Sequence, residues 1–316
     1  MNKILNFGIL GPGIISHRFV NGFQYTTGGN LFGVASRDIE KAKEYAKQYN
    51  IPNVYTSYQE MIDDPKIDVI YIATPPFLHY EQVLLCLNGG KHVICEKPFV
   101  ATRKQVQELF RVAREKNVFL MEAMKAVFLP ATKEVKKWIL ENKIGQIKYI
   151  QASYCYDGKF PETHWVYQKD LMGGGMFDVG VYPVAYINEL MNSEIVERNR
   201  ISIINKYESD DFTEIVVRYS NGVVASLQGA ITLQMDNKAV IYGTKGKIIV
   251  EHFWKANKAI LVVYDSGIEE FEVNQPSEFT YQIQEVIDCI HQGKIQSDIM
   301  GEKASLQVLE VIGDLE

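Results

Sequence analysis

The first 120 residues alternate between short apolar runs and segments with helical spacing, and this alternation restricts the fold more than any other feature of the chain. The segments 40–50 and 79–90 have the helical spacing, and the second ends in two glycines, as helices often do. Strands that alternate with helices in this way form βαβ units around a parallel sheet. The expected strands are 4–10, 30–36, 69–74, 91–97 and 118–123.

The pattern changes after Pro130. One amphipathic helix over 132–145 is followed by a series of strand-like runs. Asn221 and Gly222 lie between two alternating runs, which is a strong signal for a hairpin. The second half is therefore expected to be an α+β domain with a large, mostly antiparallel open sheet.

The length of the chain predicts two domains, because 316 residues exceed what one hydrophobic core usually supports. We expect an α/β domain at 1–121 and an α+β domain at 122–316. Helical patterns return at 278–292 and 301–314, and these helices would cover one face of the second sheet or dock on the first domain.

Composition excludes several classes of protein. The formal net charge is -6 and the basic residues form no stripe, so a nucleic-acid partner is not expected. No apolar stretch is long enough for a membrane span, and the N-terminal run is too short for a signal peptide. The six histidines are scattered, so neither a metal site nor metal-dependent hydrolysis is expected. The four cysteines are widely spaced and predict reduced thiols in the cytoplasm: Cys86, Cys95, Cys155 and Cys289.

A glycine turn follows the first expected strand. The segment "GILGPGIIS" places Gly11, Gly13 and Ser16 at G-x-G-x-x-S, at the start of a helix. In a dinucleotide-binding turn the two glycines allow the pyrophosphate to approach the N-terminal amides of that helix. The alternative is a glycine turn that serves backbone geometry alone, but the surrounding βαβ pattern favours nucleotide binding.

The end of the second strand indicates which nucleotide is preferred. An NAD-selective site usually has a carboxylate there, whereas this chain has Ser36 and Arg37. A hydroxyl and a guanidinium suit a 2′-phosphate, so we predict NADP, with NAD still possible. The alternative is that Arg37 is a solvated surface residue and that Asp38 only caps the next helix.

Two further strand ends are expected in the same crevice, because ligands of open α/β sheets bind beyond the C-terminal ends of the strands. Thr74, Pro75 and His79 follow one strand, and Glu96 and Lys97 end the next. We predict that these residues line the cofactor site, and we assign no catalytic role to His79. Pro98 would fix the turn after Lys97, with a cis peptide bond as one option.

The segment "GGGMFDVGVYP" in the second half brings Asp178 and Tyr182 four residues apart, so a helical turn would place both side chains on one side. The alternative is a glycine-rich helix start with a core tyrosine and a surface aspartate. The nearby segment "FPETHWVYQKD" offers His164 and Trp165 as a polar contact and a stacking face for a sugar, or else it is a packed aromatic loop.

Together these motifs resemble the Gfo/Idh/MocA family, named after glucose-fructose oxidoreductase, inositol dehydrogenase and MocA. The segments "GILGPGIIS", "ASRDIEKA", "IATPPFLH", "GGKHVICEKP" and "GGGMFDVGVYP" occur in family order and spacing, and "GKHVICEKP" is the most specific. The chain is most similar to the branch of dimeric dihydrodiol dehydrogenase, NADP-linked xylose dehydrogenase and glucose-fructose oxidoreductase. In that branch a tyrosine stands where the inositol dehydrogenases have a catalytic histidine.

The resemblance implies an NAD(P)-dependent dehydrogenase that acts on a hydroxyl-bearing carbon of a sugar, polyol or cyclic diol. It implies that Lys97 contacts the nicotinamide ribose and the reacting hydroxyl, that Tyr182 is the acid/base, and that Asp178 orients the substrate. A non-catalytic nucleotide sensor of the same fold is the alternative. A sensor needs no proton-transfer residues, so the presence of both Lys97 and Tyr182 favours the enzyme.

The segment "EAMKAVFLP" departs from the family pattern. Lys125 and Val127 stand where relatives of the tyrosine branch commonly have an aromatic residue and an arginine close to the substrate. The substrate is therefore the least determined part of the prediction, and Lys125 is a candidate contact. An antiparallel sheet with alternating apolar positions could also bury one face against a second subunit, so we expect a homodimer or higher homo-oligomer.

Overall fold

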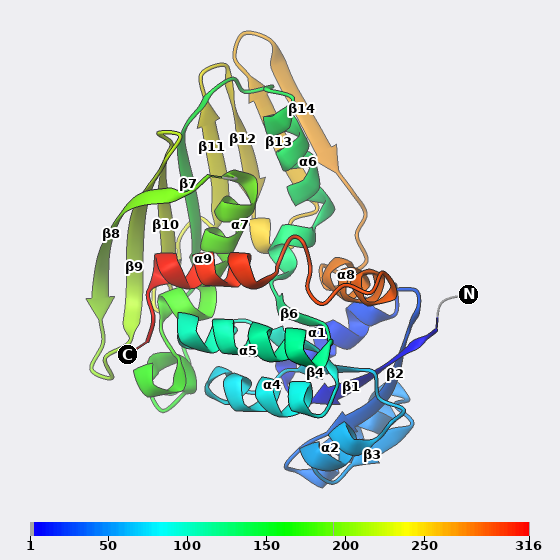
Figure 1. Cartoon of the computed structure of the whole chain (residues 1–316). Coiled ribbons are helices and arrows are strands. Elements are labelled where there is room, and N and C mark those ends of the chain that lie inside the picture. The colour runs from blue at the N-terminus through cyan, green and yellow to red at the C-terminus, as the bar shows by residue number, and fades with distance from the viewer. Residues whose placement is uncertain (1–2, 192, 316) are drawn as a thin grey trace. The chain divides into compact units, whose positions relative to one another are not determined.

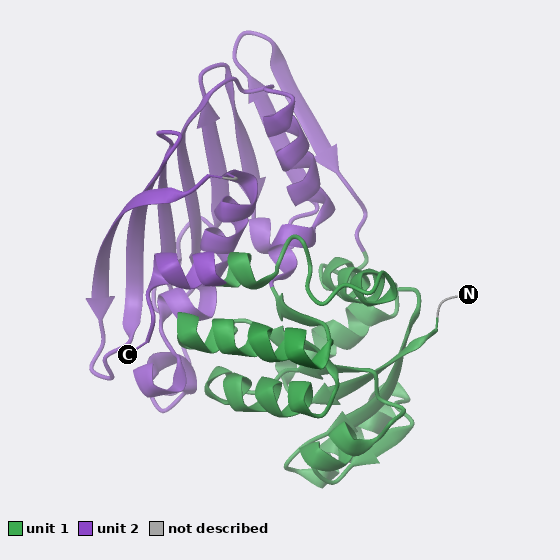
Figure 2. Cartoon of the chain, in the orientation of Figure 1, with its two compact units in different colours: residues 1–123, 276–305 green, residues 124–275, 306–316 purple. Residues whose placement is uncertain are grey.

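The computed structural model describes residues 3–191 and 193–315, which form two compact units (Figure 2). The first unit holds the chain up to Ala123 together with Pro276–Ser305, and the second holds Met124–Gln275 together with the segment from Leu306 onward. The first boundary lies within two residues of the one expected from the sequence. The segment Pro276–Ser305 lies in the range expected for the second domain, and its grouping with the first unit corresponds to the docking on the first domain considered above for the helix at 278–292.

Packing explains why Pro276–Ser305 groups with the first unit. The helix α8 (Thr280–His291) packs on α1 (Ile14–Phe23), and Thr280 Oγ1 donates to Gly22 O at 3.0 Å. Arg18 also forms an ion pair with Glu278. A Cβ at Gly22 would lie 2.6 Å from Phe279 Cβ, so the two segments meet at close range.

The first unit is a six-stranded parallel sheet in the order β3-β2-β1-β4-β5-β6 (Figure 1). Its central strands read as nearly continuous apolar runs because helices cover both faces of a parallel sheet. The strands are β1 (Leu5–Leu10), β2 (Gly29–Ala35), β3 (Asn53–Tyr55), β4 (Val69–Ile72), β5 (His92–Glu96) and β6 (Leu120–Ala123).

Local sequence signals set the ends of several helices in this unit. Asp38 caps one helix by accepting from the N–H groups of Glu40 and Lys41, and Thr102 and Gln105 form a capping box at another. Besides α1 and α8, the helices are α2 (Ile39–Tyr49), α3 (Tyr58–Asp63), η1 (Pro76–Leu78), α4 (His79–Asn88) and α5 (Arg103–Lys116).

The second unit is built on an eight-stranded sheet in the order β14-β13-β12-β11-β7-β10-β9-β8. Of the neighbouring pairs, β7 and β10 run parallel and the others antiparallel. The strands are β7 (Ile147–Cys155), β8 (Ile195–Ile204), β9 (Asp210–Tyr219), β10 (Val224–Ala230), β11 (Lys238–Gly243), β12 (Gly246–Glu251), β13 (Lys258–Val263) and β14 (Gly267–Glu272). The expected fold class, including the Asn221-Gly222 hairpin between β9 and β10, is confirmed.

Helices cover one face of this sheet (Figure 1). The helix α7 (Val181–Met191) packs on β7 and β10, and α6 (Pro130–Leu140) packs on β13 and β14. The remaining helical segments are η2 (Lys125–Phe128), η3 (Trp165–Tyr167), η4 (Lys169–Leu171), the π-helix η5 (Met176–Gly180), η6 (Phe253–Lys255) and α9 (Glu302–Ile312), which begins in the first unit and ends in the second.

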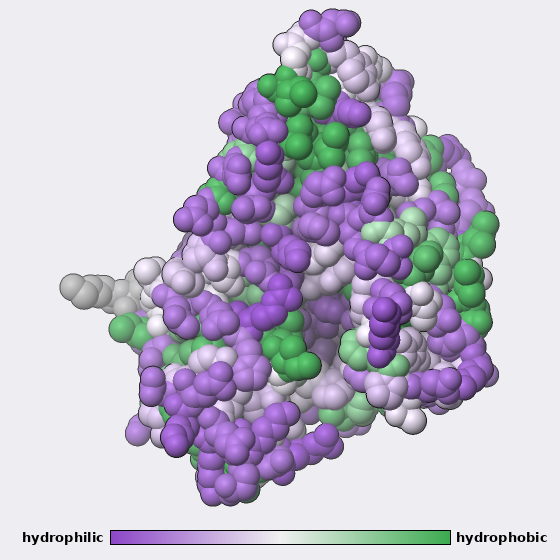
Figure 3. Space-filling view, turned by 180° about the vertical axis from the view of Figure 1, so that it is seen from behind, coloured by the Kyte–Doolittle hydropathy of each residue, from purple (hydrophilic) through white to green (hydrophobic). Residues whose placement is uncertain are grey.

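The opposite face of the sheet carries exposed apolar side chains. They alternate along the strands with the buried residues of the helix-covered face. Figure 3 views the chain from behind and shows apolar residues on this side among hydrophilic ones. Those on this face include Tyr149, Ile201, Ile203, Val216 and Ile268. Within residues 3–191 and 193–315, no helix is both long and apolar enough to cross a membrane.

Candidate active site

The turn after β1 has the geometry of a dinucleotide-binding turn. Gly11 has a φ of +86°, and a Cβ there would lie 2.5 Å from Thr74 Cγ2, so both conformation and space require glycine. The Gly11 N–H donates to Ala35 O at 3.0 Å. Ser16 is buried and its Oγ donates to Gly13 O at 2.6 Å, which joins the turn to the first residues of α1.

Gly13 is needed for a different reason. It is the N-cap of α1 with a φ of -110°, which other residues also adopt, and a Cβ would meet only Ala73 O at an ordinary 3.7 Å. The protein itself therefore leaves room for a side chain beside the N-terminus of α1. Backbone N–H groups at a helix N-terminus bind phosphate, and a side chain here would obstruct that approach. The turn fits the pyrophosphate of a dinucleotide.

The end of β2 presents Ser36 and Arg37 as the sequence predicts. Ser36 is buried, and its Oγ accepts from the Asp38 N–H at 3.2 Å. Arg37 is exposed and lies close enough to Tyr58 to oppose the rise in the pKa of that phenol that burial causes. Asp38 does cap α2, so the capping reading holds for Asp38, while the Arg37 guanidinium remains accessible to a phosphate.

The C-terminal ends of β1, β4 and β5 lie side by side, because Leu10 pairs with Ile72 and Ile72 pairs with Cys95. The strand order changes direction between β1 and β4, which is the point where open α/β sheets bind ligands. The glycine turn, the loop with Thr74 and Pro75, and the Glu96-Lys97 pair therefore meet at one edge of this sheet. Thr74 Oγ1 donates to Gln82 Oε1 at 2.5 Å, which fixes the loop on α4.

His79 is the first residue of α4, and its ring contacts the backbone of two loops. Its ring is fully buried; Nε2 lies 2.9 Å from Thr74 O, and Nδ1 lies 2.9 Å from Pro98 O. Burial lowers the pKa of His79, and these carbonyl contacts act in the opposite direction. Both ring nitrogens are occupied by the backbone, so the prediction that His79 contacts a cofactor gains no support. The side chain instead ties the loop after β4 to the loop after β5.

Glu96 and Lys97 end β5 at this edge. Glu96 is buried and its Oε1 accepts from Tyr71 OH at 2.7 Å, and the Lys97–Pro98 peptide bond is cis. Glu122 lies on the neighbouring strand β6, and burial raises its pKa to about 7 although Ser305 Oγ donates to it at 2.7 Å. Two buried carboxyl groups, those of Glu96 and Glu122, therefore lie at this end of the sheet. Glu96 directly precedes Lys97, the residue expected to contact the nicotinamide ribose.

In the second unit, three consecutive glycines lead into the helical segment that carries Asp178 and Tyr182. Gly174 has a φ of +119°, and a Cβ at this residue would lie 2.3 Å from Asp210 Oδ1. A Cβ at Gly175 would lie 2.8 Å from Gly229 O, so this segment packs backbone to backbone against β10. Glycine is therefore required by tight packing as well as by conformation.

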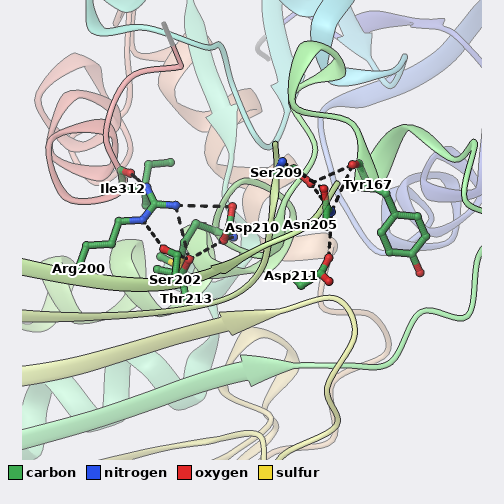
Figure 4. A network of polar contacts seen from close by, with 10 residues as sticks. Tyr167, Arg200, Ser202, Asn205, Ser209, Asp210, Asp211, Thr213 and Ile312 are labelled. Atoms are coloured by element: carbon green, nitrogen blue, oxygen red, sulfur yellow. Dashed lines mark hydrogen bonds and ion pairs between the residues drawn. The ribbon is translucent and has the colours of Figure 1, made fainter. Parts of the chain in front are cut away.

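Asp210 holds the start of this segment, as Figure 4 shows. Its Oδ2 accepts from the Met176 N–H at 2.9 Å and from Thr213 Oγ1 at 2.8 Å, and Arg200 lies 3.6 Å from Oδ1. Arg200 also donates to Ile312 O at 2.8 Å, at the end of α9. Burial raises the pKa of Asp210, while Thr213 and Arg200 act in the opposite direction. This network links β8, β9 and α9 to the π-helix, and no motif in the sequence predicted it.

Asp178 and Tyr182 are both buried, at 9% and 5% exposure. Asp178 lies on the π-helix η5, a rare conformation that often occurs at functional sites, and Tyr182 lies on the first turn of α7. Tyr156 OH donates to Asp178 Oδ2 at 2.6 Å. The expectation of a surface aspartate is excluded, and the pair lies in a polar, partly aromatic environment.

Aromatic rings and one cation surround Tyr182 within the second unit. The ring of Tyr154 lies 5.6 Å from that of Tyr182 and stacks on Trp254 with ring centroids 3.6 Å apart. Lys125 is 3% exposed, and its Nζ lies 5.8 Å from the centroid of the Tyr182 ring. Sequence reasoning missed Tyr154, Tyr156 and Trp254. The i, i+2 spacing of the two tyrosines, one in β7 and one directly after its end, was the available signal.

His164 and Trp165 lie in the same unit. The ring of His164 stacks on Phe160 at 4.2 Å between centroids, and its Nδ1 accepts from the Val166 N–H at 3.3 Å. Burial lowers the pKa of His164, and Asp178 acts in the opposite direction, which places the imidazole within electrostatic reach of that carboxylate. Both side chains are half-buried. In the described part of the chain, no group of three or more His, Cys, Asp or Glu side chains could hold a metal ion.

A glycine turn at the switch point of a parallel sheet is the dinucleotide-binding arrangement of a Rossmann domain. The chain belongs to the Gfo/Idh/MocA family. Residues 5–124 match the family model described as "Oxidoreductase family, NAD-binding Rossmann fold", and residues 132–249 match the GFO/IDH/MocA C-terminal domain. The protein is therefore an NAD(P)-dependent oxidoreductase, and the family predicted from the motifs is confirmed.

Several characterised proteins are similar along nearly the whole chain. The trans-1,2-dihydrobenzene-1,2-diol dehydrogenase of Xenopus tropicalis is 32% identical, with 98% of this chain and 96% of that protein covered. The scyllo-inositol 2-dehydrogenase (NADP(+)) IolU of Bacillus subtilis (strain 168) is 29% identical, with 98% and 95% covered. The solved structure of aldose-aldose oxidoreductase from Caulobacter crescentus shares the fold at a TM-score of 0.88 and 23% identity, with 98% and 96% covered.

Proposed function

We propose that the protein transfers a hydride between NADP and a hydroxyl-bearing carbon of a sugar, polyol or cyclic diol. The observation that carries this proposal is the buried Asp178-Tyr182 turn, with Tyr156 bonded to Asp178 and Lys125 beside Tyr182. A tyrosine in such a place can exchange the proton of a substrate hydroxyl. The names of the relatives support this substrate class, since they act on a dihydrodiol, an inositol or aldoses.

The proposed chemistry divides among three side chains. In the oxidation direction, Tyr182 accepts the hydroxyl proton, Lys97 donates a hydrogen bond to the same oxygen and to the nicotinamide ribose, and Asp178 accepts from a neighbouring hydroxyl and so orients the substrate. The bound nicotinamide supplies the hydride chemistry. Lys125, His164 and Trp165 are the proposed contacts to the rest of the substrate.

The proposed cofactor site lies at the strand ends of the first unit. Gly11, Gly13 and Ser16 hold the pyrophosphate turn, and Thr74, Pro75 and Glu96 belong to the loops beside the nicotinamide. His79 contributes by holding the loop backbone rather than by contact. The exposed guanidinium of Arg37 and the hydroxyl of Ser36 support a preference for NADP, because arginine binds phosphate with paired, charge-assisted hydrogen bonds.

A screen of aldoses, polyols and diols with NADP and with NAD, followed by absorbance at the nicotinamide band, tests the function. We expect reduction of the cofactor with at least one compound and a higher kcat/KM with NADP. An Arg37→Ala variant should lose roughly tenfold or more of that preference, because it removes a charge-assisted contact to the 2′-phosphate. A clear advantage for NAD in the unmodified protein would contradict the cofactor assignment, and no turnover with any compound would contradict the substrate class.

We also propose that the protein forms a homodimer or higher homo-oligomer through the open face of the second sheet, and that it works in the reducing cytoplasm. All four cysteines are buried, unpaired thiols, which supports a reducing compartment. On the open face, Ile201 is 77% exposed and Ile203 is 61% exposed. Exposure of these apolar side chains to water costs free energy, and a subunit interface would remove that cost.

Light scattering at micromolar concentration checks the oligomer. The expected mass is twice that of the chain or more, and Ile201→Lys combined with Ile203→Lys should reduce it to one chain. Leu140→Lys is the matched control, because Leu140 is 78% exposed on α6 and away from the open face. A monomer mass for the unmodified protein would overturn the interface.

A further inference from the structure

We propose that Lys125 is a positioning residue for Tyr182: its ammonium favours the ionised form of the phenol and so offsets part of the cost that burial imposes on proton transfer to Tyr182. The inference deepens the proposed function, because it rests on Tyr182 as the acid/base. It adds a cation that comes from the same unit of the structure as the tyrosine. The distance between the two side chains is therefore set by the fold of that unit.

The geometry fixes both partners. Lys125 Nζ lies 5.8 Å from the centroid of the Tyr182 ring, and the two residues are 3% and 5% exposed. Lys125 begins η2, whose residues are all buried and which packs on α7. Thr132 Oγ1 donates to Ala126 O at 2.6 Å and holds η2 against the start of α6. The ammonium is therefore held over the ring by buried backbone and is shielded from bulk water.

Burial alone would work against catalysis. Removing a phenol from water disfavours the phenolate, and the neighbouring buried tyrosines show this, because burial is the largest cause of the raised pKa of Tyr156 and of Tyr186. With the 5.8 Å between Nζ and the ring centroid taken as the separation, a unit charge in a medium of effective dielectric constant about 20 offsets this by on the order of one to two pH units. A buried ammonium at the distance of Lys125 thus offsets part of the cost that burial imposes on the phenolate.

Asp178 and Tyr154 are two further groups of the second unit that lie near Tyr182. Asp178 on η5 opposes the phenolate, but it accepts a hydrogen bond from Tyr156 OH, which disperses its charge. Tyr154 on β7 faces Tyr182 with an uncharged ring.

The elements that also pack on α7 add no cation at this ring in the described residues. Lys136 of α6 is paired with Glu189, at the far end of α7 from Tyr182. His252, which precedes η6, and Lys255, its last residue, are exposed. Lys97 of the first unit is proposed to act on the substrate oxygen, and the effect of Lys125 is additional to it.

NMR of the full-length protein labelled at the tyrosine ring Cζ carbon tests this inference, because the Cζ chemical shift follows ionisation of each phenol. The Tyr182 signal is assigned by its absence in Tyr182→Phe. We expect the Tyr182 titration midpoint to rise by about one pH unit in Lys125→Met, which removes the charge and keeps the chain length, and to return to within a few tenths in Lys125→Arg. An unchanged midpoint in Lys125→Met would overturn the proposal.

Two controls separate charge from structure. Tyr154→Phe alters the neighbouring ring without a change of charge, so the Tyr182 midpoint should stay where it is. If Lys125→Met does not fold, Lys125→Gln takes its place, and its midpoint decides the question in the same way. The titration needs no turnover, so it tests Lys125 even where the substrate screen fails. Conversely, a kcat/KM profile that shifts with the NMR midpoint supports both the inference and the proposed function.

Discussion

Replacing Tyr182 by phenylalanine is expected to lower kcat by about 10²- to 10⁴-fold while affinity for NADP stays within about twofold. The substitution removes one oxygen and keeps the ring, so the contacts with Tyr154 and α7 persist. What is lost is the group proposed to take the hydroxyl proton, and proton transfer by a positioned side chain contributes an effect of this size. Steady-state kinetics with the substrate found in the screen, and fluorescence titration with NADPH, measure the two quantities.

Tyr154→Phe is the matched control for this loss. Tyr154 lies beside Tyr182 and stacks on Trp254, so its substitution changes the same aromatic cluster by the same single oxygen. We expect kcat to fall by less than about tenfold, since no proton transfer is assigned to this hydroxyl. Equal losses in the two variants would mean that the cluster, and not the Tyr182 hydroxyl, is what catalysis needs, and would contradict the assignment.

Gly174→Ala should destabilise the folded protein by about 3 kcal/mol or more. The φ of +119° is a conformation that residues with a side chain adopt only under strain, which costs on the order of 1–3 kcal/mol. In addition, the new Cβ would lie 2.3 Å from Asp210 Oδ1, and the Asp210 carboxylate is held by Met176 N–H and Thr213 Oγ1. The clash therefore displaces either the carboxylate or the start of the π-helix. Unfolding in urea followed by circular dichroism measures the loss.

Gly222→Ala provides the comparison for Gly174→Ala. Gly222 also has a positive φ, of +86°, but nothing lies within 4 Å of a Cβ placed there, so only the conformational cost of about 1–2 kcal/mol applies. Similar decreases in the urea unfolding midpoint for the two variants would show that the Asp210 carboxylate moves aside at little cost in free energy. This result would contradict the role of Asp210 in holding the segment that carries Asp178. A further fall in kcat for Gly174→Ala at a temperature where it is folded would instead support that role.

Patterns within a few residues of the chain predicted most of the first unit correctly. The strands β4 and β5 were predictable because burial on both faces requires uninterrupted apolar residues, and the caps at Asp38 and Thr102 follow from side chains that bond their own backbone nearby. The three-residue strand β3 was not predicted, since it is too short to establish a period. The π-helix was also missed, because its sequence has no feature that separates it from an ordinary helical turn.

The candidate site was predictable where a motif carries its own geometry. Gly11 and Gly13 can be recognised by their position directly after a strand. Asp178 and Tyr182 can be recognised by their spacing of four residues. The hydrogen bonds that hold the segments of the site in place were not predictable. Asp210 bonds the Met176 N–H across 34 positions of the chain, and His79 bonds Pro98 O across 19. Such partners meet through packing of whole elements, and no local pattern encodes which residues will meet.

The sequence by itself determined the two kinds of sheet, the glycine turn and the residue types of the proposed proton-transfer chemistry, because these depend on periodicity, glycine conformation and short spacings. The tertiary structure alone decided that His79 joins the loops after β4 and β5, that residues 276–305 join the first unit, and that a buried lysine at position 125 lies over Tyr182. The physical reason is that side chains distant in the chain acquire a common environment only when their elements pack, and that environment sets their charge and their hydrogen bonds.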